Sequence, residues 1–249
     1  MSDLSPDSRQ MNRIQRLLAR TLGARMLSGS LSKVVIRGHT GRRITVDRAF
    51  YRAQKLAERS TLALRLSPWA WQVGQELRNA PVAALSPLVL FRARPDDCSI
   101  HGWEQMGPPP VGCAHDGRYN RAGTSVLYLS DSEEGARLEV AGGRICIQQY
   151  AIHAPPLRIA DLASEEASNL LHAAFDLAEK ACVPGWSGPA TYVFSQFLAR
   201  SIRRSGFDGF IVPGVRGSSS IRYRNVVLFS PEGTWPSWSK GPRGFRRDP

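Results

Sequence analysis

The chain has 249 residues, of which 42% are hydrophobic, so it can bury a core as one large domain or two small ones. No apolar run approaches the roughly 18 residues of a membrane span, and no signal-peptide-like stretch opens the chain, which predicts a cytoplasmic protein without a membrane span. The net charge of +12 comes from residues 1–95, which contain 17 Lys and Arg but only 5 Asp and Glu. Residues 96–249 contain 16 residues of each sign.

Residues 1–82 are predicted to form a basic, mainly helical accessory region. The expected elements, in chain order, are an amphipathic helix over 11–27, a β-prone piece at 34–36, a helix from Asp47 to about Leu66, a helix over 69–77 and a turn at 79–81. The surplus of positive charge favours contact with an anionic partner, either nucleic acid or an acidic protein. A solvated charged face is the alternative interpretation.

The stretch 117–139 combines a turn, a strand and a short helix. Residues 126–129 are apolar and β-prone, which predicts a strand. Ser130 or Asp131 is expected to cap the next helix, because both side chains accept hydrogen bonds from the free N–H groups of a first turn. Glu139 ends that helix. By itself, this carboxylate is typical of a solvated helix end, since an isolated Glu is mostly exposed.

Six segments in order resemble a known family. They are a strand at 88–94, a proline-rich loop at 107–110, the stretch 117–140, a strand with its turn at 157–162, a helix at 192–198 that leads into a strand by 210, and a closing strand at 225–229. Together, over residues 87–231, they resemble the RES domain, a family of NAD-consuming toxins with an ADP-ribosyltransferase-like fold. The resemblance implies an α+β domain at 83–231, with a mixed, split β-sheet and flanking helices. An irregular C-terminal tail is expected at 232–249.

The resemblance also implies roles for individual side chains, with NAD as substrate and no metal. Arg92 and Arg118 would hold phosphate or ribose, because a guanidinium binds phosphate bidentately. Tyr119 and Tyr128 would face the nicotinamide. Glu139 would stabilise the positive charge that develops when the glycosidic bond breaks. The catalytic set would thus be Glu139, Arg118 and Tyr128, and the NAD-binding set Arg92, Arg118, Tyr119 and Tyr128. Taken without the family, Arg92 is typical of a strand-end surface charge and Tyr128 of a core aromatic.

One position departs from the family pattern, which is named for Arg, Glu and Ser. The serine position is occupied by Gly214, and Ser218, Ser219 and Ser220 are the alternative sources of a hydroxyl. If none of these acts, Gly214→Ser is expected to raise the turnover of NAD. Asn120, which lies within the stretch 117–139, is expected to shape the turn.

Two functional hypotheses follow. The resemblance implies a toxin that cleaves the nicotinamide–ribose bond, as a glycohydrolase, a phosphorylase or a protein ADP-ribosyltransferase, and that a cognate antitoxin inhibits. The glycine at the serine position favours the alternative, a catalytically weak RES-like protein that binds nucleic acid or protein through its basic N-terminal region.

The cysteines indicate a reducing compartment, since Cys98, Cys113, Cys146 and Cys182 include no Cys-x-x-Cys pair. Cys98, His101, Cys113 and His115 have the right chemistry for zinc. The Cys-x-His spacing of the second half is tighter than in common zinc knuckles, however, and the loop is rich in Pro and Gly. We therefore interpret them as ordinary loop residues and expect no metal.

Overall fold

The computed structural model describes residues 33–37, 43–47, 64–65, 68–83, 88–96, 102–140, 143–152, 157–180, 192–214, 216, 221–229 and 245–248. In these stretches no helix is both long enough and apolar enough to cross a membrane. The predicted helix over 11–27, the alternative serines at 218–220 and the cysteines at 98 and 182 lie outside the described residues.

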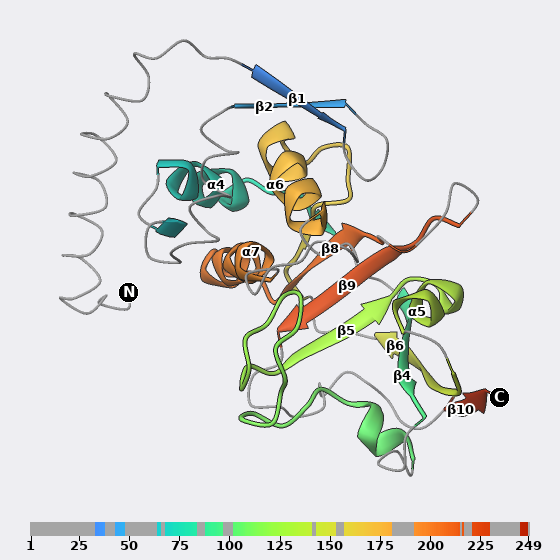
Figure 1. The fold of residues 1–249 in the computed structure, drawn as a ribbon. Helices are drawn as coiled ribbons and strands as arrows, with labels where there is room; N and C mark the ends of the chain where they lie inside the picture. Colours follow the sequence, from blue (N-terminus) through green and yellow to red (C-terminus); the bar gives the residue numbers. More distant parts are fainter. Residues whose placement is uncertain are drawn as a thin grey trace.

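A mixed sheet forms the centre of the fold (Figure 1). Its strands are β3 (Val82–Ala83), β4 (Leu88–Pro95), β5 (Val126–Ser130), β6 (Ile145–Ile152), β7 (Ile159–Asp161), β8 (Gly209–Pro213), β9 (Arg224–Phe229) and β10 (Arg246–Asp248). The order across the sheet is β10-β6-β4-β5-β9-β8-β7-β3. All described neighbours are antiparallel except β7 and β8, which are parallel. A separate antiparallel pair joins β1 (Lys33–Arg37) and β2 (Arg43–Asp47).

The sheet is split between β4 and β5. β4 pairs with β6 along its whole length, from Leu88 to Pro95. It meets β5 at a single residue pair, Phe91 and Ser130. β5 pairs fully with β9 on its other edge. The sheet therefore consists of two halves joined beside Ser130, close to the residue where the next helix begins. This arrangement confirms the expected α+β class with a mixed, split sheet.

Helices flank the sheet. They are α4 (Pro68–Arg78), the 3-10 turn η1 (Trp103–Met106), α5 (Glu133–Glu139), α6 (Asn169–Lys180) and α7 (Val193–Arg204). Figure 1 shows α4, α6 and α7 gathered on one side of β8. The sequence of α7 explains its orientation, since Phe194, Leu198 and Ile202 recur at four-residue intervals and are buried. Arg203 and Arg204 are exposed on its other face.

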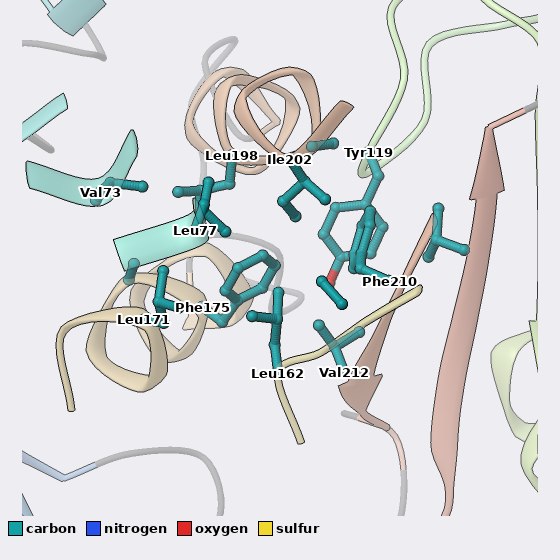
Figure 2. Packing of buried hydrophobic residues seen from close by; sticks show 14 of the residues in the cluster. Val73, Leu77, Tyr119, Leu162, Leu171, Phe175, Leu198, Ile202, Phe210 and Val212 are labelled. Atoms are coloured by element: carbon teal, nitrogen blue, oxygen red, sulfur yellow. The ribbon is translucent and has the colours of Figure 1, made fainter. Parts of the chain in front are cut away.

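The main hydrophobic core lies between these three helices and β8 (Figure 2). Val73 and Leu77 of α4, Phe175 of α6 and Leu198 of α7 point toward Phe210 of β8. Each of these side chains is at most 3% exposed. Val73 and Leu77 precede residue 82, where the sequence places the end of the accessory region. α4 thus shares its core with elements on the other side of that predicted boundary.

Most of the expected elements occur where the sequence predicts them. The strands at 34–36, 88–94, 126–129, 157–162 and 225–229, and the helices at 69–77 and 192–198, each overlap an observed element. The elements that were not predicted here are β2, β3, β6, α6 and the 3-10 turn η1. β6 is the partner of β4 along its full length. The most important element missing from the prediction therefore belongs to one half of the sheet.

Two expectations are wrong in detail. Ser132 caps α5 in place of Ser130 or Asp131, because its Oγ accepts a hydrogen bond from the N–H of Gly135 at 3.0 Å. The tail at 232–249 is not irregular throughout, because β10 pairs with β6. That pairing joins residues about a hundred positions apart, which local sequence patterns do not reveal.

Candidate functional site

The helix α5 ends at Glu139, which is the centre of the candidate site. The cap at Ser132 and the acidic residues Glu133 and Glu134 favour the start of this helix, where the backbone N–H groups are free. The helix stops because Val140 adopts an extended backbone, with φ −98° and ψ 126°. The side chain of Glu139 is 25% exposed, so its carboxylate is open to a ligand although neighbours hold it.

Four side chains surround the carboxylate of Glu139. The hydroxyl of Tyr223 and Nδ2 of Asn225 each donate a hydrogen bond to Oε1 at 2.7 Å. Nη2 of Arg118 and Nε of Arg216 lie 3.9 and 3.8 Å from Oε2. The last two distances are too long for direct hydrogen bonds. Oε1 is therefore fixed by two neutral donors, whereas Oε2 faces two cations and keeps capacity to accept a hydrogen bond from a ligand.

The ring of Tyr223 occupies a slot between two glycines. Gly214 is its cross-strand neighbour, since the N–H of Gly214 donates to the carbonyl of Tyr223 at 2.8 Å. A β-carbon on Gly214 would lie 2.2 Å from Cε2 of the ring, and a β-carbon on Gly135 of α5 would lie 2.5 Å from its Cγ. Real side chains do not approach so closely, so glycine at both positions makes room for the phenol. Tyr223 is consequently 5% exposed.

This slot corrects the expectation for residue 214. Gly214 is not among the glycines with positive φ, so it is required for space and not for its backbone conformation. A serine there would overlap the Tyr223 ring. The structure therefore gives a steric reason to expect that Gly214→Ser lowers turnover instead of raising it, because an aromatic side chain already fills the space of the added side chain.

The phenol of Tyr223 remains a hydrogen-bond donor. Burial raises the pKa of Tyr223, and the hydrogen bond to Glu139 and the charge of that carboxylate raise it further. The hydroxyl oxygen also accepts the backbone N–H of Arg216 at 3.1 Å. With that acceptor position used, the hydroxyl proton is directed to Glu139.

A tight turn presents Arg118 to this carboxylate. The N–H of Gly117 donates to the carbonyl of Asn120 at 2.9 Å, which closes the turn. Oδ1 of Asn120 accepts a hydrogen bond from the hydroxyl of Tyr128 at 2.8 Å. The turn-shaping role expected for Asn120 is therefore confirmed. The hydroxyl of Tyr128 supports the same turn from β5.

Helix α7 fixes the turn from its other side. The hydroxyl of Ser195, which is fully buried, donates to the carbonyl of Arg118. Nε2 of Gln196 donates to the carbonyls of Gly117 and Asn120 at 3.0 and 2.8 Å. The backbone of Arg118 is thus anchored by a helix packed on the core, so the side chain of Arg118 starts from a fixed backbone position.

The structure places Tyr119 in the hydrophobic core. Its ring is 3% exposed and lies edge-on to Phe210, with ring centroids 5.0 Å apart, as Figure 2 shows. It also stacks with Tyr128 at a centroid distance of 6.2 Å. The expected role of Tyr119 as a wall for nicotinamide does not fit a ring enclosed by other aromatics. We therefore assign it to packing beneath the Arg118 turn.

Arg92 holds a loop in the structure. Its Nη1 donates to the carbonyl of Met106 at 2.8 Å and to the carbonyl of Gly107, at the start of the proline-rich loop. Burial lowers the pKa of Arg92, and nearby tyrosines, Tyr150 first, oppose that effect. A guanidinium stays charged in such surroundings. The expected role of Arg92 toward NAD stays a prediction, and its described contacts are structural.

The structure therefore brings together Arg118 and Glu139 from the expected set. It adds three residues that sequence reasoning missed, Tyr223, Asn225 and Arg216. One signal was available. Asn225 is a polar residue near the start of an otherwise apolar strand, and Tyr223 lies two positions earlier, so both project to the same side. No local sequence pattern, however, indicated that these two side chains contact Glu139.

The possible metal ligands do not form a site in the part of the chain that is described. Cys113 and His115 are exposed, whereas Cys98 and His101 lie outside it. Within the described stretches no group of three or more His, Cys, Asp or Glu side chains is placed to hold a metal ion.

Comparison with known proteins addresses the family directly. No curated protein matches the chain. Among solved structures, a chain from the crystal structure of the M. tuberculosis MbcT-MbcA toxin–antitoxin complex is similar, with 14% identity and a TM-score of 0.41, over 65% of this chain and 86% of that one. The RES domain matches residues 89–236, which is more than half of the sequence and includes Arg118, Glu139 and Tyr223. The chain therefore belongs to the RES domain family.

Proposed function

We propose that this protein consumes NAD by cleaving the bond between nicotinamide and ribose. The observation that carries the proposal is the convergence of Arg118 and Glu139, whose Nη2 and Oε2 atoms lie 3.9 Å apart at a partly exposed position. An anion-binding guanidinium beside a fixed carboxylate matches a substrate that has a pyrophosphate at its centre and a ribose that becomes cationic. Membership of the RES domain family points in the same direction.

In the proposed reaction the C–N glycosidic bond breaks and its electron pair leaves with nicotinamide, which becomes neutral. Positive charge develops on the ribose ring, and the carboxylate of Glu139 stabilises it electrostatically. A nucleophile then adds to the anomeric carbon. Water would give ADP-ribose with release of a proton, phosphate would give a phosphorylated ADP-ribose, and a protein side chain would become ADP-ribosylated.

The fixed donors around Glu139 suit this role. Tyr223 and Asn225 hold Oε1, so the carboxylate does not reorient when charge develops. Arg118 and Arg216 lie on the side of Oε2, where a phosphate or ribose hydroxyl would be bound. A preorganised carboxylate avoids the reorganisation that water would need, which is the main source of electrostatic catalysis.

The experiment is direct. Purified full-length protein is mixed with NAD, and free nicotinamide is measured by chromatography over time. Release that depends on protein and disappears in Glu139→Gln supports the proposal. Equal release in the wild type and in folded Glu139→Gln protein contradicts it. Repeating the assay with and without phosphate separates hydrolysis from phosphorolysis, and label retained on protein identifies ADP-ribosyl transfer.

The proposal includes a toxin role and a cognate antitoxin. Depletion of NAD stops growth, so a cell that makes such an enzyme requires an inhibitor in the same compartment, which we take to be the cytoplasm. Expression of the wild type in a bacterial host should lower cellular NAD and arrest growth, while Glu139→Gln should do neither. Co-expression of the neighbouring gene's product should restore growth if that product is the antitoxin.

A separate observation keeps the binding function as the second candidate. Arg65, Arg121 and Arg200 line one pocket beside α7. Burial lowers the pKa of Arg200, and Arg204, Arg65 and Arg121 lower it further through their like charges. Such a cluster attracts an anionic partner. Binding to nucleic acid that weakens steeply with salt, and is lost in Arg200→Gln, would favour this candidate.

A further inference from the structure

We propose that Tyr223, the residue just before β9, is a positioning residue for Glu139, and that its phenol supplies the hydroxyl that the family pattern places at residue 214. The inference rests on the proposed function, in which Glu139 stabilises the charged ribose. It assigns a role to a residue outside the Arg, Glu and Ser of the family name.

The first argument is the fit of the ring. Tyr223 lies between Gly214 and Gly135, and a β-carbon at either position would overlap its ring atoms. The two glycines come from different elements, the end of β8 and the first turn of α5. A side chain enclosed on both faces loses its rotational freedom, so its hydroxyl is held at one point.

The second argument is the direction of the hydroxyl. It accepts the N–H of Arg216 and donates to Oε1 of Glu139, so its donor and acceptor functions are both assigned. A hydrogen bond to an ionised acceptor is shorter and stronger than one between neutral groups, and the 2.7 Å distance agrees with that. The phenol therefore fixes the plane of the carboxylate.

The third argument concerns the two oxygens of Glu139. Oε1 accepts from both Tyr223 and Asn225, whereas Oε2 has only its long ion pairs to Arg118 and Arg216 among the described residues. The ribose would accordingly meet Oε2. Tyr223 acts through Glu139 and does not itself touch the reacting bond.

Residue 214 explains why a tyrosine can take this position. The resemblance to the family implies that Gly214 stands at the serine position, and its cross-strand neighbour is Tyr223. Cross-strand neighbours have β-carbons about 4.5–5.5 Å apart, so a long side chain on one strand can cover a glycine on the other. The missing side chain at residue 214 thus leaves the space that the ring of Tyr223 occupies.

The test compares Tyr223→Phe with the wild type. Phenylalanine keeps the ring in its slot and removes the hydroxyl. We expect kcat for nicotinamide release to fall about 10-fold, the loss typical of a hydrogen bond to a charged group, with little change in KM for NAD. The matched control is Tyr192→Phe, which removes a hydroxyl from a tyrosine that is 38% exposed at the start of α7 and should leave kcat unchanged.

A second measurement needs no turnover. Proton NMR of the free full-length protein should show a downfield hydroxyl signal that is absent in Tyr223→Phe. The signal should move upfield in Glu139→Gln, where the acceptor becomes a neutral amide. The absence of any hydroxyl signal that responds to both substitutions would overturn the positioning role, as would an unchanged kcat in Tyr223→Phe. If the wild type releases no nicotinamide, the proposed function fails, while the NMR signal still decides whether Tyr223 holds Glu139.

Discussion

The ring of Tyr223 covers Gly214 so closely that a β-carbon on residue 214 would lie 2.2 Å from the ring. The two residues face each other across antiparallel strands, and the hydroxyl at the end of the ring reaches Glu139. A substitution at residue 214 is therefore transmitted to the candidate site through Tyr223.

Gly214→Ser should destabilise the protein and lower its turnover of NAD. Overpacking a filled site typically costs about 1–3 kcal/mol in free energy of unfolding, because the ring must leave its slot. Urea unfolding measures the cost. Combining Gly214→Ser with Tyr223→Ala removes the ring, so the two costs should be clearly non-additive in a double-mutant cycle. Strict additivity would show that the ring and residue 214 do not meet.

Gly135 contacts the other face of the Tyr223 ring, and substitutions of two glycines in helices can test this contact. Gly135→Ala in α5 should destabilise, because the new methyl group would overlap Tyr223. Gly74 of α4 is the matched control, since nothing lies within 4 Å of a β-carbon built there. Gly74→Ala should stabilise by about 0.5–1 kcal/mol, the usual gain in a helix interior. Thermal or urea unfolding of the two variants should give opposite signs.

Glu139→Gln should keep the fold and the binding of NAD but reduce turnover by about 100-fold or more, as expected when one electrostatic catalytic group is lost. Glutamine keeps a side-chain oxygen that can accept from Tyr223 and Asn225, so the surrounding hydrogen bonds have a partner. Single-turnover release of nicotinamide, with binding measured separately by calorimetry, checks the prediction. A folded variant with unchanged turnover would remove Glu139 from the mechanism.

Arg118→Ala should raise the KM for NAD by about 10- to 100-fold, the range typical of losing a hydrogen bond to a charged group. The fold should survive, because Ser195 of α7 holds this residue through its backbone carbonyl, which the substitution keeps. Arg118→Lys should recover little, since lysine lacks the planar fork that binds phosphate at two points. Steady-state kinetics of the three proteins provides the measurement, and a fully active lysine variant would contradict the proposed geometry.

The stability of the protein should fall at alkaline pH partly through Tyr223. Its pKa is raised above the ordinary 10.0, so above that pH the unfolded chain loses a proton that the folded protein retains. The stabilisation is complete below about pH 10 and is lost at about 1.4 kcal/mol per pH unit as the pH rises toward the folded pKa. Urea unfolding at about pH 9, 10 and 11 should show a shallower decline for Tyr223→Phe. Tyr150→Phe should act similarly, because burial raises the pKa of Tyr150.

The local pattern of the sequence was sufficient for many elements. The apolar run at 126–129 predicts a strand, and the resemblance to the family predicts a helix at 192–198; the structure contains both. Arg118 and Glu139 were found because they lie in one continuous motif that resembles the RES domain, whereas the local pattern alone made Glu139 typical of a solvated helix end. β6 and β10 were missed, since their pairing depends on partners far along the chain.

The sequence by itself determined the α+β class and two charged residues of the candidate site, because its ordered set of motifs resembles the RES domain, and short-range patterns added several single elements. Only the tertiary structure decided what surrounds them. It enclosed Tyr119 in the core, turned Arg92 toward backbone carbonyls and brought Tyr223, which precedes β9, to Glu139. The physical reason is that the surroundings of a side chain are set by cross-strand register and by packing between distant elements. A single absent β-carbon, at Gly214, leaves the room that Tyr223 fills.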